Sequence, residues 1–166
     1  MARRRVRRFG KGKMFKVNIV AVGKIKEKWY AEAFNEYVKR LARFCEVKTF
    51  ETKEESLENL SADVALKKES EAVLPLLKGK IVALCVEGEK ISSEDFAKKL
   101  NRIKDDAGEV TFVVGSSCGL DETVKKKADF KLSFSEMTFP HTLFRVMLAE
   151  QIYRAFMING GGKYHK

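Results

Sequence analysis

The sequence predicts an α/β protein in which a mostly parallel sheet is flanked by helices, and two observations predict this class. Apolar clusters rich in β-branched residues alternate along the chain with segments in which apolar residues recur every three or four positions. Such alternation is typical of parallel strands joined by crossover helices. The chain also has 166 residues, of which 45% are hydrophobic and only two are proline, so that it fits one domain with one core.

Five clusters predict strands, at residues 16–22, 46–50, 81–86, 110–114 and 130–133. Between the first two strands, apolar residues at helical spacing predict a helix with one apolar face, made of Trp29, Ala33, Phe34, Tyr37 and Leu41. A second helix is predicted over residues 62–77. Ser92 followed three residues later by Asp95 is typical of a helix start, and it predicts a third helix whose apolar face holds Phe96, Leu100 and Ile103.

The last helix is predicted to run from about residue 143 to residue 158, entered through Pro140 and Thr142 and ended by the glycines at 160–162. Apolar residues lie around most of the helix circumference; these are Leu143, Phe144, Val146, Met147, Leu148, Ile152 and Phe156. Two interpretations stay open: a helix in the core of one chain, or a helix partly buried by a second subunit. Glu150 and Arg154 lie four residues apart in the order that favours an ion pair.

The net charge of +10 is concentrated at the N-terminus, because the first thirteen residues hold seven of the 33 cations and none of the 23 acidic residues. Residues 1–13 are therefore predicted to be a basic leader that is disordered or not part of the domain. Residues 14–166 are predicted to form a single domain. An upstream start, a cloning remnant, an RNA-contacting arm and an Arg-rich organelle presequence stay open as interpretations of the leader.

No apolar run approaches the ~18–20 residues that span a bilayer. The three cysteines, Cys45, Cys85 and Cys118, are odd in number and widely spaced, which fits neither a disulfide framework nor a paired zinc motif. We therefore expect a reduced, cytoplasmic protein that uses no metal and contacts no membrane.

Loops that follow strands are the places where open α/β sheets bind ligands. Gly115 and Gly119 follow the fourth predicted strand and permit the backbone to approach a ligand closely, although a plain strand-to-helix turn explains the same glycines. The surrounding sequence is neither a P-loop nor a dinucleotide fingerprint. Cys118 with His141 or His165 is a candidate pair of nucleophile and base, and the alternative is an incidental thiol.

The last seven residues, Gly-Gly-Gly-Lys-Tyr-His-Lys, combine three glycines with two cations, an aromatic ring and an imidazole. Such a tail suits a contact to nucleic acid in which the ring stacks on a base and the cations neutralise phosphate. A frayed terminus is the alternative. Arg154 is a further candidate site residue because it lies near this tail.

The run Leu-Ser-Phe-Ser-Glu-Met-Thr-Phe-Pro-His at residues 132–141 is followed by Arg145, by Glu-Gln at 150–151, by Tyr-Arg-Ala at 153–155 and by Tyr-His-Lys at 164–166. This pattern resembles the RlmH family of bacterial 23S rRNA pseudouridine N3-methyltransferases, which belong to the SPOUT class. The run Lys-Val-Asn-Ile-Val-Ala-Val-Gly-Lys at residues 16–24 and the Gly115 loop are similar to the same family. The resemblance therefore covers residues 14–166.

The resemblance implies a C-terminal part threaded into a trefoil knot and a homodimer that packs through the two knots. It implies S-adenosylmethionine as the cofactor, with Leu84, Gly115, Phe134, Ser135, Glu136, Met137, Thr138 and Phe139 at the family's cofactor-contacting positions. One position departs from the family, because Ser116 stands where a second glycine is usual. That departure puts the backbone path at Ser116 in doubt.

The implied reaction transfers the cofactor's methyl group to N3 of a pseudouridine in helix 69 of 23S rRNA, within assembled ribosomes. We expect Arg154 to stabilise negative charge on the base, and Tyr164 and His165 to position the base and relay its proton. The tail of one chain is expected to complete the site of the other. Two rivals stay open: a non-catalytic RNA-binding module of the same fold, with Ser116 as its lesion, and a hydrolase that uses Cys118.

Overall fold

The computed structural model describes residues 13–166, so that the predicted leader lies outside the described residues except for Lys13. Five strands form one sheet: β1 (Phe15–Val22), β2 (Cys45–Thr52), β3 (Lys80–Lys90), β4 (Glu109–Val114) and β5 (Phe130–Ser133). All neighbouring strands pair in parallel, in the order β2-β1-β4-β3-β5. The predicted class, a parallel sheet flanked by helices, is confirmed.

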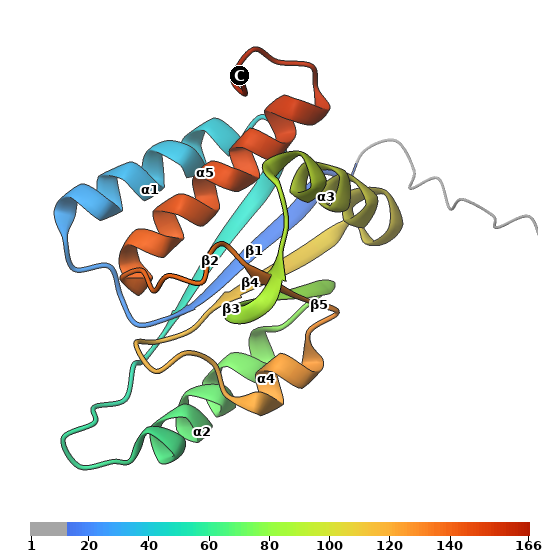
Figure 1. Cartoon of the computed structure of the whole chain (residues 1–166). Helices are drawn as coiled ribbons and strands as arrows, with labels where there is room; N and C mark the ends of the chain where they lie inside the picture. The colour runs from blue at the N-terminus through green and yellow to red at the C-terminus, as the bar shows by residue number, and fades with distance from the viewer. Residues whose placement is uncertain (1–12) are drawn as a thin grey trace, which may run out of the picture.

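Helices cover both faces of this sheet (Figure 1). One face carries α1 (Lys28–Leu41), α3 (Ser93–Ala107) and α5 (His141–Asn159), and α5 packs between the other two. The opposite face carries α2 (Ala62–Val73) and α4 (Glu122–Lys127). The sheet therefore separates two apolar layers, as expected when each crossover helix must bury one face.

The two layers follow from the alternation of side chains along the strands. In β1, Val17 and Ile19 are fully buried under α1, α3 and α5, whereas Val20 is fully buried on the side of α2 and α4. Phe112 and Val113 divide in the same way in β4. Because both faces of the central strands are covered, these strands read as continuous apolar runs.

Two helices differ from the predictions. The predicted helix over 62–77 ends at Val73 and continues as a short 3₁₀ turn, Leu74–Leu76, because Pro75 has no backbone N–H for a helical hydrogen bond. Helix α4 was not predicted, since it has six residues and only Val124 of them is buried. Trp29, predicted to lie on the apolar face of α1, is 65% exposed.

The start of α3 and the end of α5 lie where the sequence predicts them, whereas α5 begins at His141, two residues before the predicted start. Ser92 accepts a hydrogen bond from the Asp95 backbone N–H at 3.1 Å and caps the start of α3. Gly160 follows the last residue of α5. No helix among residues 13–166 is long and apolar enough to cross a bilayer.

Strand β3 carries a bulge that shapes the edge of the sheet. Leu132 of β5 pairs with Leu84 before the bulge and with Glu89 after it, so that residues 85–88 project from the pairing. Gly88 permits this close passage, because a Cβ there would lie 2.6 Å from the Leu132 carbonyl carbon. The bulge brings residues 85–87 to the carboxyl ends of the strands, where they form part of a cavity wall.

Candidate functional site

A cavity of about 670 Å³ lies at the carboxyl ends of β3, β4 and β5, where open parallel sheets bind ligands. Its walls come from the β3 bulge, the loop after β4, the segment after β5 and the start of α5. Seven of the eight predicted cofactor residues line it: Leu84, Gly115, Phe134, Ser135, Met137, Thr138 and Phe139. A cavity of this size suits a cofactor of nucleoside dimensions.

The eighth predicted residue, Glu136, does not line this cavity. Its side chain is 82% exposed, and its carboxylate forms an ion pair with Lys90 at the surface. The rest of the segment is held locally, because the Ser133 hydroxyl donates to the Ser135 carbonyl oxygen at 2.9 Å and the Phe134 ring packs 4.6 Å from the Phe144 ring. The residues of this segment that line the cavity are therefore apolar or carry a hydroxyl group, and none is charged.

The loop after β4, residues 115–119, is a tight turn. Ser116 and Gly119 exchange two backbone hydrogen bonds, of 3.2 and 2.9 Å. A Cβ at Gly115 would lie 2.2 Å from the Gly119 carbonyl oxygen, so no larger residue fits there. Ser116 causes no such conflict, since it is buried with its hydroxyl donating to Glu69 at 2.9 Å and does not have a positive φ.

One charged pair also faces the cavity. Lys125 of α4 and Glu87 of the β3 bulge form an ion pair, and both residues line the wall. The Lys125 ammonium group, which donates a hydrogen bond to Glu87, lowers the pKa of the Glu87 carboxyl below its usual range. These are the charged groups that a polar part of a ligand meets there.

A second cavity of about 480 Å³ adjoins the first. The two cavities share four residues: Leu132, Ser133, Phe134 and Phe139. The other walls of the second cavity come from α1, α3 and α5, with Tyr37, Ser93 and Glu150 among them. Glu150 connects this cavity to the C-terminal tail.

The tail residues converge on Glu150. Arg154 Nε donates to Glu150 Oε1 at 2.9 Å, which confirms the predicted ion pair, and the Tyr164 hydroxyl donates to the same oxygen at 3.0 Å. Arg154 also lies over the Tyr164 ring, 4.8 Å from its centroid. Arg154 Nη1 lies 3.1 Å from His165 Nδ1, and His165 Nε2 lies 2.9 Å from a carboxylate oxygen of Glu94. The structure therefore brings all three predicted catalytic residues together.

The hydrogen-bond partners assign the His165 tautomer. A guanidinium group has no acceptor, so Arg154 must donate to Nδ1, and the ring proton then lies on Nε2 and is donated to Glu94. This hydrogen bond from His165 lowers the pKa of the Glu94 carboxyl. Burial, together with hydrogen bonds to Tyr37 and Glu150, raises the pKa of Tyr164 well above its ordinary value. Tyr164 is therefore a neutral donor near pH 7 and a poor base.

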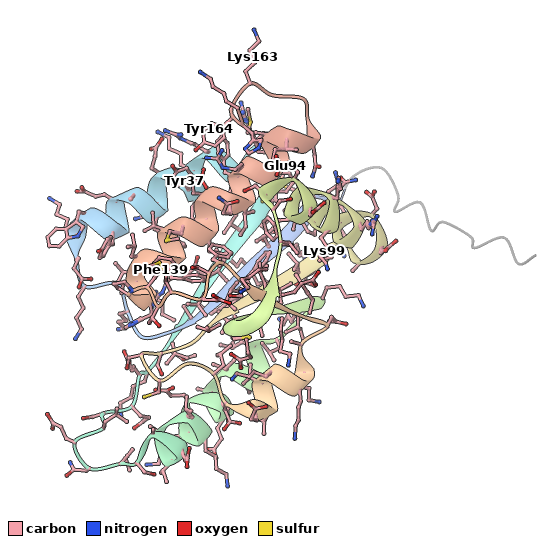
Figure 2. The ribbon with its side chains drawn as sticks, in the orientation of Figure 1. Tyr37, Glu94, Lys99, Phe139, Lys163 and Tyr164 are labelled. Carbon is pink, nitrogen blue, oxygen red and sulfur yellow. The ribbon has the colours of Figure 1, made fainter. Side chains whose placement is uncertain are left out.

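The tail and the larger cavity lie at opposite ends of α5. His141 lines the larger cavity, and Arg154 is thirteen residues further along the helix, which corresponds to about 20 Å at 1.5 Å per residue. Figure 2 shows Phe139 near the start of α5, whereas Tyr164 lies beside Tyr37 toward its far end. None of the predicted catalytic residues lines either cavity.

The start of α5 is fixed by a buried cation. The Arg145 side chain is 1% exposed, and its guanidinium group donates to Glu51 Oε2 at 2.7 Å and to the Gly23 carbonyl oxygen at 2.6 Å. His141, four residues earlier, lies 3.5 Å from Glu54 Oε2. These contacts join α5 to the ends of β1 and β2 and so hold one wall of the larger cavity.

Sequence reasoning missed three acidic residues: Glu54 contacts Ser117 and His141, Glu69 contacts Ser116, and Glu94 contacts the predicted catalytic residue His165. Glu54 and Glu69 lie in polar stretches without a motif, and Glu94 lies within the helix start at residues 92–95, which does not indicate a contact with the tail. Tyr37 was predicted as an apolar face residue, and that pattern did not reveal its place in the second cavity.

The structure gives the Cys118 interpretation no supporting contact. Within residues 13–166, neither histidine is hydrogen-bonded to the Cys118 thiol: His141 pairs with Glu54, and His165 contacts Arg154 and Glu94. In the same described residues no group of three or more His, Cys, Asp or Glu side chains could hold a metal ion.

Comparison with known proteins identifies the family. A family model described as "Predicted SPOUT methyltransferase" matches residues 15–165. The chain is 45% identical over 154 residues to ribosomal RNA large subunit methyltransferase H of Caldicellulosiruptor bescii, covering 90% of this chain and 99% of that one. It is 44% identical over 158 residues to the protein of the same name from Acetivibrio thermocellus, covering 91% and 99% of the two chains.

Among solved structures, a probable methylase family protein from Haemophilus influenzae superposes with a TM-score of 0.56 at 13% identity. The match covers 90% of this chain and 70% of that one, and it shows a shared fold. The family model covers nearly the whole described chain, and its methyltransferase fold agrees with a parallel sheet that opens into a cavity at its carboxyl edge. This chain belongs to the SPOUT methyltransferase family.

Proposed function

We propose that the protein is a methyltransferase of large-subunit rRNA that uses S-adenosylmethionine and methylates N3 of a pseudouridine in helix 69. The observation that carries the proposal is the larger cavity, which is lined by seven of the eight residues expected to contact the cofactor. The relatives named ribosomal RNA large subunit methyltransferase H cover 90% or more of this chain and support the same substrate class.

The cavity residues fit this cofactor chemically. Residues 115–119, 133–135 and 137–140 line the cavity, where their main-chain groups would suit an adenine edge and apolar side chains such as Leu84 and Leu132 would suit its faces. Glu87 and Lys125 offer one negative and one positive group for the ammonium and carboxylate of a methionine moiety. When bound, the cofactor supplies an electrophilic methyl group, and the protein must align the base and accept its N3 proton.

The tail supplies the groups for this task. Arg154 stays a cation beside Glu150, and the guanidinium edge toward His165 is placed to stabilise negative charge on the base. His165 is proposed to relay the proton once Arg154, which donates to Nδ1 in this structure, turns from the ring to the base: Nδ1 then accepts the N3 proton, and the Nε2 proton passes to Glu94. The raised pKa of Tyr164 makes its hydroxyl a donor that positions the base and not the group that removes the proton.

The separation along α5 supports a homodimer. Within one chain, Arg154 lies ten residues, or about 15 Å of helix, beyond Phe144, the last residue of α5 that lines the cofactor cavity. In addition, Val146 and Met147 of α5 are only half-buried and line the second cavity, so an apolar surface is left for a partner. We propose that a second copy packs against α5 and brings its own tail to the cofactor cavity.

RNA recognition is proposed to depend on the assembled ribosome, in the cytoplasm. The local cations are Arg154, Lys163 and Lys166, and residues 14–166 carry only a small excess of positive charge. Phosphate contacts from so few cations give weak binding that does not distinguish sequences. The shape of the ribosomal particle must then supply the remaining specificity.

Mass mapping of modified nucleotides in 23S rRNA tests the proposal. Ribosomes from cells without this protein are incubated with the protein and isotope-labelled S-adenosylmethionine, and free 23S rRNA is treated in parallel. We expect one labelled N3-methylpseudouridine in helix 69 of the ribosomes and much slower labelling of the free RNA. Label elsewhere contradicts the assigned substrate, and equal labelling of free RNA contradicts the dependence on the ribosome.

The alternative function, a non-catalytic RNA-binding module, was suggested by Ser116, and the structure at Ser116 does not support it. Ser116 keeps a regular backbone, and its hydroxyl has a buried partner in Glu69. Calorimetry with S-adenosylmethionine separates the two functions, because a non-catalytic module that lost its cofactor site gives no heat of binding.

A further inference from the structure

The loop at residues 115–119 is held from outside the cavity by a buried carboxylate. Glu69 of α2 is 4% exposed, and its Oε2 accepts a hydrogen bond from the Ser116 hydroxyl at 2.9 Å. Its other oxygen, Oε1, accepts the Glu55 backbone N–H at 3.0 Å. One carboxylate therefore joins α2, the segment after β2 and the loop.

A second carboxylate holds the next residue of the loop. Glu54 Oε1 accepts both the backbone N–H of Ser117, at 3.2 Å, and its hydroxyl, at 2.9 Å. Glu54 Oε2 lies 3.5 Å from Nε2 of His141, which lines the cavity at the start of α5. Glu54 thus connects two walls of the cavity that are far apart in the sequence.

The loop has little internal structure that could replace these contacts. Its internal hydrogen bonds are the two between the backbones of Ser116 and Gly119 and one from the Cys118 backbone N–H to the Ser116 hydroxyl at 3.3 Å, and Ser117 at its tip is exposed. Gly119 has a φ of +88°. Glycine adopts positive and negative φ about equally well, so Gly119 does not by itself fix the shape of the loop. The position of the loop over the cavity therefore depends on groups outside it.

We propose that Glu54 and Glu69 are positioning residues that hold the loop at residues 115–119 in its cofactor-binding shape. In this arrangement Ser116 is the partner of Glu69 and contributes to the cofactor site. The proposal rests on the proposed function only in naming S-adenosylmethionine as the ligand of the cavity.

The first test uses Glu54, which is partly exposed and can be replaced without emptying the core. Glu54→Ala should weaken S-adenosylmethionine binding, measured by calorimetry, about tenfold, the change expected when charge-assisted hydrogen bonds are lost. Glu55→Ala is the matched control, because the Glu55 carboxylate pairs with Lys53 and only its backbone takes part in the contacts above. It should change the affinity less than about twofold. Equal losses in the two variants overturn the role of Glu54.

The second test examines the buried hydrogen bond between Ser116 and Glu69 with a double-mutant cycle of Glu69→Gln and Ser116→Ala. If the two residues act through their mutual hydrogen bond, the double variant should bind S-adenosylmethionine about as weakly as the weaker single variant. In each variant the KM for S-adenosylmethionine should rise while kcat at saturation stays within about twofold. If Glu69→Gln lowers the Tm but leaves the affinity unchanged, Glu69 only stabilises the fold, and the proposal is overturned for that residue.

Hydrogen exchange separates a failure of this proposal from a failure of the proposed function. Without any ligand, the amides of residues 116–119 should exchange faster in Glu54→Ala and Glu69→Gln than in the parent protein or in Glu55→Ala. Unchanged exchange in both variants overturns the positioning role. A parent protein that binds no S-adenosylmethionine instead overturns the proposed function, and the exchange rates still decide whether the two carboxylates hold the loop.

Discussion

The larger cavity and the C-terminal tail lie at opposite ends of α5 and are built from different materials. Residues of the β3 bulge and of two loops form much of the cavity wall, and buried groups such as Glu69 and Arg145 hold the wall in place. The tail is instead held by contacts among partly exposed side chains, which converge on Glu150 and Glu94. The cavity is lined mostly by uncharged residues, whereas the tail presents charged and aromatic groups.

This difference predicts different responses to mutation. The cavity should tolerate side-chain substitutions that leave the main chain of its loops in place. It should lose affinity for the cofactor when a new atom displaces that main chain. In the tail, by contrast, loss of a single side chain should be enough to impair function, since its contacts are made by the side chains themselves. Substitutions in the cavity should therefore change cofactor affinity, and substitutions in the tail should change methyl transfer.

The largest effect is expected at Gly115. Gly115→Ala places a Cβ 2.2 Å from the Gly119 carbonyl oxygen, a distance that forces the loop to move. We expect calorimetry to show a loss of S-adenosylmethionine affinity of at least about 100-fold, or ~2.7 kcal/mol. Gly119→Ala is the control, because its Cβ meets no atom within 4 Å and the substitution costs only the strain of a positive φ. A larger loss at Gly119 than at Gly115 contradicts the steric explanation.

The next effect concerns the tail and should be confined to catalysis. His165→Ala removes the imidazole between Arg154 and Glu94, and we expect methyl transfer to ribosomes to fall about 100-fold, the usual size of a lost proton relay. Affinity for S-adenosylmethionine should stay within about twofold, since His165 lines neither cavity. Lys163→Ala, a neighbour in the same tail, should reduce transfer much less. Unchanged transfer in His165→Ala removes His165 from the mechanism.

These two regions also differ in how far the sequence predicts them. The strands and the long helices follow from apolar periodicity, and Ser92 and Gly160 mark helix ends where the structure has them. Helix α4 escapes this reasoning because a single buried side chain, Val124, makes no periodic stripe. The contacts of Glu54 and Glu69 with Ser117 and Ser116 span 63 and 47 residues, and no local pattern encodes such a pairing.

The candidate site follows from the resemblance more than from residue spacing. Spacing four apart predicts the pair of Glu150 and Arg154, and the structure confirms it. Convergence of Tyr164, His165 and Glu94 on that pair depends on the turn made by residues 160–162 and on the position of α3, which spacing does not contain. The trefoil knot stays a prediction from family membership, since strand order and register do not by themselves describe threading.

A smaller effect is expected on the alkylation rates of the three cysteines, which differ between the cavity and the core. Cys85 and Cys118 line the larger cavity, whereas Cys45 is buried in the core, where burial raises its pKa to about 12. At pH 8 very little of Cys45 is then a thiolate, so iodoacetamide should leave it unmodified in the folded protein. Saturating S-adenosylmethionine should slow alkylation of Cys118 and Cys85 several-fold, as followed by peptide mass spectrometry.

Urea-unfolded protein provides the control for this experiment, because all three cysteines should then react at similar rates with or without cofactor. Alkylation of Cys85 and Cys118 at the same rate with and without the cofactor contradicts the assignment of the cavity. Equal protection of Cys85 and Cys118 supports a ligand that reaches both the β3 bulge and the loop after β4.

The smallest effect is expected from the leader, which belongs to neither region. Deleting residues 1–13 removes seven cations and lowers the formal net charge from +10 to +3. Because unspecific phosphate contacts depend on released counterions, RNA affinity should fall several-fold at ~50 mM salt, and the difference should disappear above ~300 mM. Cofactor affinity and the methylated position should not change.

Filter binding of an rRNA fragment across this salt range measures the effect, with calorimetry of S-adenosylmethionine on the same truncated protein. A loss of cofactor affinity on truncation shows that the domain boundary at residue 14 is wrong. A loss of RNA affinity that persists at high salt indicates specific contacts from the leader. In that case the basicity relevant to RNA recognition would include the leader as well as Arg154, Lys163 and Lys166 of the tail.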